Sequence, residues 1–119
     1  METTPPIVCD LSVLSAAQRA RLEDVAGRVL PRADRLRELA DGYAVGFIDA
    51  PADLLADLAA FIALDRLCCA FLRHALVSDP GPGLTWLELT GGPGAKEAIA
   101  DDILTSVPGE LTAATSGAG

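Results

Sequence analysis

Two turn signals, each set between runs of alternating apolar residues, constrain the fold of this chain most. An Asp-Gly pair between two such runs is typical of a β-hairpin, and a cluster of Pro and Gly between two runs marks a turn. The first run also has helical spacing, with Gly42 as an alternative helix C-cap, and we favour the hairpin. The turns are Asp41-Gly42 and residues 79–83, and the flanking runs are residues 33–40, 43–47, 74–77 and 84–89.

Helical periodicity predicts three helices around these hairpins. Ser15 and Gln18 fit a capping box, and Pro31 ends the helix that follows. Pro51 suits the first turn of a second helix that runs to about Cys69, and residues 95–103 give a third.

The run Ile7-Val8-Cys9-Asp10-Leu11 is β-branched at its start and predicts a strand ahead of the first helix. Hairpins that alternate with helices favour an α+β fold, with an antiparallel sheet built from β-hairpins and about three helices packed on one face. The 119 residues predict one domain, which we place at 6–107, followed by a disordered C-terminal tail at 108–119.

The charge balance excludes several partners. With 17 acidic against 9 basic residues, the formal net charge is -8, so we expect no nucleic-acid partner and no binding to anionic membranes. The first residues lack the basic and apolar regions of a signal peptide, and we expect a cytoplasmic protein. We expect a small-molecule or metal ligand, and a homodimer is left open.

One helical turn departs from the local pattern. Asp65 falls within the apolar stripe of the helix that begins near Pro51, and Cys68 and Cys69 follow it at i+3 and i+4. A carboxylate on an apolar face needs a partner, a proton or a ligand. Asp65 could donate a proton to a reacting group. It could instead form a salt bridge with Arg66, Arg73 or another cation, or be exposed at a frayed helix end.

The third cysteine is Cys9. The count is odd and a reducing compartment is expected, so a disulfide framework is not predicted, and plain core packing of the thiols stays an alternative. A helix C-terminus raises a cysteine pKa, which disfavours a spontaneous thiolate, but a soft metal ion would deprotonate the thiols on binding. Free sulfurs would need to lie about 3.5–4.5 Å apart to share such an ion.

His74 is the only histidine, and we keep it as a weak candidate ligand because a lone histidine is more often a surface or core residue. No Cys-x-x-Cys or His-x-x-x-His spacing is present, so the zinc signal is weak.

The segment Asp65-Arg66-Leu67-Cys68-Cys69-Ala70-Phe71 resembles the mark of a group of small, largely uncharacterised bacterial proteins: an acidic residue, two positions, then Cys-Cys-x-Phe. Members commonly carry Glu at the acidic position and Pro between Cys and Phe. The resemblance covers roughly residues 6–105 and includes a cysteine on an N-terminal segment, here Cys9. Some such proteins are associated with mercury- or arsenic-resistance contexts, which implies a thiophilic ligand.

These observations lead to three hypotheses of different classes. The first is thiol-based binding of a soft metal or metalloid ion, such as Hg(II) or As(III), by Cys9, Cys68 and Cys69 beside a buried Asp65. The second is a small enzyme with Asp65 and Cys69 as catalytic residues, similar in residue types to organomercurial lyase or to other cysteine catalysts. The third is a non-catalytic interaction domain with cysteines in its core.

Overall fold

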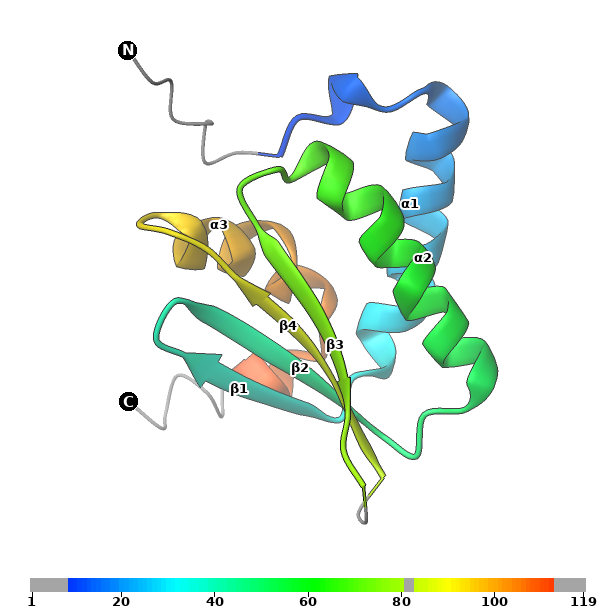
Figure 1. Ribbon diagram of the computed structural model, residues 1–119, viewed down its shortest axis with the longest axis vertical. Helices are drawn as coiled ribbons and strands as arrows, with labels where there is room; N and C mark the ends of the chain where they lie inside the picture. Colours follow the sequence, from blue (N-terminus) through cyan, green and yellow to red (C-terminus); the bar gives the residue numbers. More distant parts are fainter. Residues whose placement is uncertain (1–8, 81–82, 113–119) are drawn as a thin grey trace.

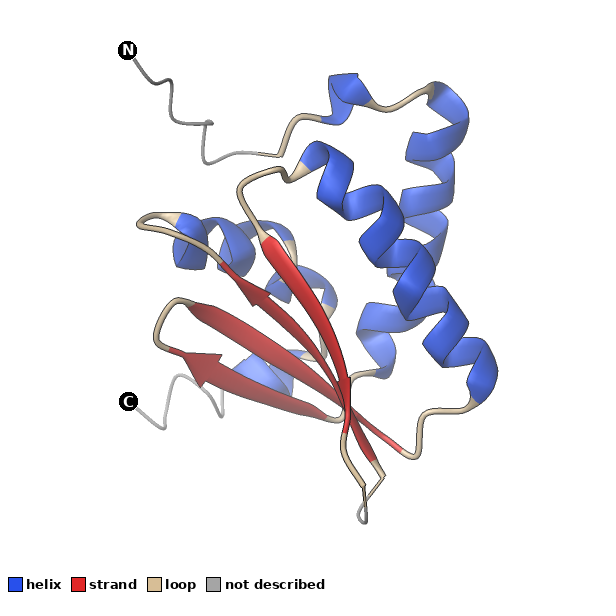
Figure 2. Cartoon of the chain, viewed as in Figure 1, coloured by secondary structure: helices blue, strands red, loops and turns tan. Residues whose placement is uncertain are grey.

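The computed structural model describes residues 9–80 and 83–112. An antiparallel sheet of four strands, in the order β1-β2-β4-β3, carries the helices on one side, as Figures 1 and 2 show. The helices and strands are α1 (Ala16–Val29), β1 (Arg35–Leu39), β2 (Gly42–Ile48), α2 (Ala52–Cys68), β3 (Arg73–Ser78), β4 (Leu84–Thr90) and α3 (Ala95–Asp102). The predicted α+β class, with hairpins and helices on one face, is confirmed.

Both predicted hairpins form. β1 pairs with β2 across a turn at Ala40 and Asp41, one residue before the predicted Asp41-Gly42, because Gly42 already pairs with Leu39. β3 pairs with β4, while β2 and β4 join the two hairpins at the centre of the sheet. Gly42 lies opposite Thr90, and a Cβ atom at Gly42 would overlap the backbone carbonyl of Leu89. A glycine is therefore required at this close approach, and the sequence pattern 33–48 is a hairpin rather than a helix.

One face of the sheet packs against the helices to close the core. The central strands alternate, so that their inward side chains meet buried residues of the helices, among them Leu58 of α2 and Ile99 of α3. α1 packs along α2, and α3 lies against β2 and β4 (Figure 1). The buried inward residues of the central strands are Val45, Phe47, Leu87 and Leu89.

The α1 helix starts as the sequence predicts. Ser15 and Gln18 form a reciprocal capping box, in which each side chain accepts a hydrogen bond from the other residue's backbone N–H. The helix ends before Pro31, which lies in a short 3-10 turn, Leu30–Arg32.

The strand predicted at residues 7–11 is wrong over its described part. Cys9 and Asp10 have no strand pairing, and Leu11 opens a 3-10 turn, Leu11–Val13. The Asp10 side chain accepts the backbone N–H of Ser12 and caps this turn, while the Asp10 N–H donates to the carbonyl of Cys68 at 2.8 Å. Local hydrogen bonds to a short polar side chain outcompete a β ladder here, and the segment attaches to the end of α2 instead of to the sheet. Ile7 and Val8 lie outside the described residues.

The packed region extends beyond residue 107. Residues 109–112 are helical, and Leu111 packs against the core cluster. Residues 113–119 of the predicted tail lie outside the described residues. Within the described ranges, none of the helices combines the length and the apolar run that a bilayer span requires.

Candidate functional site

The end of α2 positions the two adjacent cysteines. The helix ends at Cys68, and Cys69 leaves the helical conformation with φ -109° and ψ 65°, although its N–H still donates to the Asp65 carbonyl at 2.8 Å. This break turns the two side chains, which a continuing helix would splay apart, toward one another. Their sulfur atoms lie 3.8 Å apart, inside the range that a shared ion requires.

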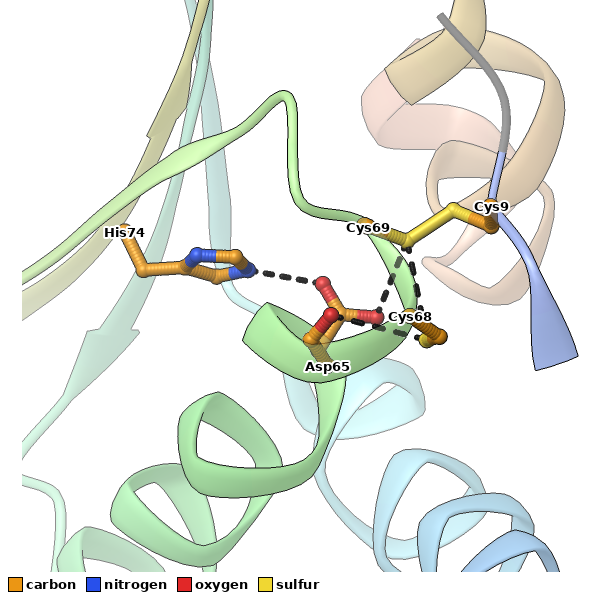
Figure 3. A network of polar contacts seen from close by, with 5 residues as sticks. All are labelled: Cys9, Asp65, Cys68, Cys69 and His74. Carbon is orange, nitrogen blue, oxygen red and sulfur yellow. Dashed lines mark hydrogen bonds and ion pairs between the residues drawn. A yellow bond between two sulfur atoms is a disulfide. The ribbon is translucent and has the colours of Figure 1, made fainter. Parts of the chain in front are cut away.

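Cys9 lies against this turn and is bonded to Cys69 by a disulfide that spans 60 residues of sequence (Figure 3). The expectation that the cysteines would not pair is therefore wrong for Cys9 and Cys69. An odd count leaves one thiol free but does not prevent the other two from meeting, and Cys68 is the free, buried cysteine. The hydrogen bond from Asp10 to Cys68 is what brings the N-terminal segment to this place.

Asp65 is buried, with 5% of its surface exposed, and the sequence prediction that it lies in the apolar stripe of its helix is confirmed. Its carboxylate has two neighbours on opposite sides. One oxygen, Oδ2, lies 2.7 Å from His74 Nε2, and the other, Oδ1, lies 3.6 Å from Cys69 Sγ (Figure 3). Once the disulfide is reduced, the Cys69 thiol stands where it can donate to Asp65.

His74 is the hydrogen-bond partner of Asp65, in place of the Arg66 or Arg73 named from the sequence. Its side chain is only 3% exposed, because its position opposite Leu89 turns it to the helix-covered face of the sheet. The alternation along β3 carried this signal, since it places His74 on the same face as Leu76 and opposite Arg73. No described buried side-chain nitrogen or oxygen lacks a hydrogen-bond partner, so His74 satisfies the carboxylate.

The surroundings of the free Cys68 thiol favour its protonated form. Burial raises its pKa above the usual value, and the nearby charge of Asp65 raises it further. Its Sγ donates a weak hydrogen bond to the Asp65 carbonyl, at 3.5 Å. The expectation that the C-terminal turn of the helix would not hold a pre-ionised nucleophile is confirmed for Cys68.

Asp65, Cys68 and Cys69 form a buried group that can hold a metal ion, because their ligand atoms all lie within 4.8 Å of one another. The donor set contains two sulfurs and one carboxylate, and sulfur ligands favour soft ions. The Cys69 sulfur is bonded to Cys9, so the disulfide must be reduced before Cys69 can bind a metal ion as a thiolate together with Asp65 and Cys68.

A hollow of about 340 Å³ adjoins this group and includes Cys9, Asp65, Cys68 and Cys69 in its lining. It lies between α1, the end of α2 and the segment that follows α3. Cys68 and Cys69 are buried and Cys9 is partly buried, yet all three border a space in which a small ligand fits.

Comparison with known proteins assigns no family. The chain matches no family model, no curated protein and no solved structure at the level of significance applied.

Proposed function

We propose that this protein binds a soft metal or metalloid ion, such as Hg(II) or As(III), through Cys9, Cys68 and Cys69 after the Cys9–Cys69 disulfide is reduced. One observation carries the proposal: the Cys69 sulfur is bonded to Cys9 and lies 3.8 Å from the Cys68 sulfur, so all three cysteines meet at one point. The ion is the protein's ligand or cargo. The resemblance of residues 65–71 to small bacterial proteins from mercury- and arsenic-resistance contexts supports the same ligand class.

Ion binding requires a thiol reductant that first opens the Cys9–Cys69 disulfide. A dithiol reduces the disulfide to two protein thiols and is itself oxidised to a disulfide. Arsenous acid, As(OH)₃, then exchanges its three hydroxyls for three cysteine sulfurs and releases three water molecules. We propose a cytoplasmic location, because the thiol reductants of that compartment keep such a site reduced.

Asp65 and His74 assist the exchange of arsenic-bound hydroxyls for cysteine sulfurs. The carboxylate, 3.6 Å from Cys69 Sγ, orients the reduced thiol and receives its proton as the sulfur bonds to the ion. His74 Nε2 lies 2.7 Å from the other oxygen, Asp65 Oδ2, and holds the carboxylate in place on the side away from the sulfurs.

Isothermal titration of the reduced protein with arsenite or Hg(II), under anaerobic conditions, tests the proposal. We expect one ion per chain, a heat that disappears in the Cys68→Ser/Cys69→Ser variant, and a weakened association in Cys9→Ser. The oxidised protein is the matched control, because it differs only in the disulfide. An unchanged stoichiometry in the double variant would refute the proposal.

A second candidate function is protonolysis of an organomercurial, and the contacts of Asp65 favour it. A buried carboxylate beside a thiol is the residue set that resembles organomercurial lyase, in which sulfur takes the mercury and the acid protonates the leaving carbon. In balanced form, one cysteine thiol displaces the counter-anion of the arylmercurial as its acid, and the second thiol gives its proton to the Asp65 carboxylate as its sulfur binds mercury. Asp65 passes that proton to the carbon as the carbon–mercury bond breaks, and mercury stays bound to the two sulfurs. Gas chromatography of the hydrocarbon released from an arylmercurial separates turnover from binding.

The third hypothesis, an interaction domain with core cysteines, makes a contrasting prediction. Its sulfurs would stay unreactive in the reduced native protein and react only after unfolding. Thiol titration before and after denaturation distinguishes it from both functions above.

A further inference from the structure

The hollow beside the cysteines has a wall of apolar side chains. These come from four separate parts of the fold, and most of them are buried residues of the core cluster. The apolar residues of this wall are Leu11, Leu22, Ala26, Leu30, Phe61 and Ile103.

A bare ion would use little of this space. An ion held by three sulfurs is enclosed by its ligands, whereas the hollow measures about 340 Å³, within the range of roughly 300–1,000 Å³ that is usual for small-molecule sites. An apolar cavity of about 150 Å³ is large enough to take up benzene. The space next to the sulfurs is thus of a size and character that suits an alkyl or aryl group.

The charged residues at the hollow are acidic. Glu23 on α1 and Asp102 at the end of α3 line it and are both exposed to solvent. Among the lining residues no lysine, arginine or histidine balances them. An anionic ligand would be repelled at this opening, and a neutral or cationic one would not.

We infer that the ligand is an organic derivative of the soft atom, neutral or cationic, whose alkyl or aryl group fills the apolar hollow while the soft atom binds the cysteine sulfurs. This inference rests on the proposed function and adds the class of ligand. A trivalent arylarsenical, R–As(OH)₂, exchanges two hydroxyls for two sulfurs and releases two water molecules, and its carbon–arsenic bond stays intact. The organic group then takes the place of the third sulfur and points into the hollow.

Competition between the reduced protein and dithiothreitol tests this inference with three probes: methylarsonous, phenylarsonous and 4-carboxyphenylarsonous acid. Dithiothreitol corrects for the intrinsic affinity of each arsenic atom for two thiols. We expect the phenyl compound to bind about tenfold better than the methyl compound relative to dithiothreitol, because it buries more apolar surface. The carboxylate derivative should lose most of this gain.

Two substitutions on α1 form a matched pair for the same assay. Ala26→Leu fills the hollow and should abolish the preference for phenyl over methyl, whereas Ala20→Leu adds the same group on the exposed side of the helix and should leave it unchanged. If Ala26→Leu does not fold, the relative binding of the three probes to the unsubstituted protein still tests the inference.

The outcomes separate the two claims. Equal binding of the methyl and phenyl compounds, or a phenyl preference that survives in a folded Ala26→Leu variant, overturns the inference, while arsenite binding by the same sample leaves the proposed function standing. Failure of arsenite and of all three probes to bind overturns both.

Discussion

The two ends of α2 present the same stripe to the protein interior but differ in chemistry. Toward its start, Leu54 and Leu58 pack into the core with almost no exposed surface. In the last turn, the same stripe carries Asp65 and Cys68, which are equally buried but polar or reactive. The first region needs only apolar volume, whereas the second needs a histidine, a disulfide and a hollow. Position on the stripe therefore fixes burial, and only the neighbours decide what a buried side chain does.

Reduction of the disulfide should have the largest effect on the reactive end. Because the bridge closes a loop across a sequence separation of 60 residues, its loss should lower the free energy of unfolding by about 4 kcal/mol on the chain-entropy account. Urea unfolding of the oxidised and reduced proteins measures this difference. The Cys9→Ser variant should match the reduced protein in stability, and a variant as stable as the oxidised protein would contradict the account.

Leu58→Ala tests the packing end of the same helix. Leu58 is fully buried, so the cavity left behind should cost about 3 kcal/mol of unfolding free energy. The rate at which Cys68 reacts with a thiol reagent in the native state should be unchanged at low denaturant. A Leu58→Ala protein with altered metal stoichiometry would show that the two ends are not separable.

His74→Gln removes the imidazole that contacts Asp65 at the reactive end. We expect a loss of about 2 kcal/mol of unfolding free energy, because the buried Asp65 side chain loses its 2.7 Å hydrogen bond to His74 Nε2. Asp65→Asn/His74→Gln should recover part of the loss, since it removes the buried charge as well. Equal stability of the single variant and the unsubstituted protein would show that His74 does not hold the carboxylate.

The smallest effect is the dependence of stability on alkaline pH. Burial and the charge of Asp65 raise the pKa of the folded Cys68 thiol above that of an exposed cysteine, so its contribution to stability is complete below the pKa of the unfolded chain and is lost as the pH rises through the folded pKa. Unfolding free energies measured from pH 7 upward should therefore fall more steeply for the unsubstituted protein than for Cys68→Ala. Parallel curves would contradict the raised pKa.

Local patterns predicted most of the fold and part of the site. The first hairpin, whose turn lies one residue before the predicted Asp41-Gly42, is set by neighbours in sequence, as are the capping box at Ser15 and the i, i+3, i+4 grouping of Asp65 with the two cysteines. The disulfide and the His74 contact were missed, because each depends on how distant segments pack. Cys9 is 60 residues from Cys69, and its strand was mispredicted from β-branched residues whose neighbour Asp10 favours a turn.

X-ray absorption at the arsenic edge of the reduced protein, loaded with one equivalent of arsenite, tests the central claim most directly. The account predicts three sulfur neighbours around arsenic, falling to two in Cys9→Ser. An arsenic atom surrounded by oxygen, or an identical sulfur shell in Cys9→Ser, would show that the three cysteines do not act together.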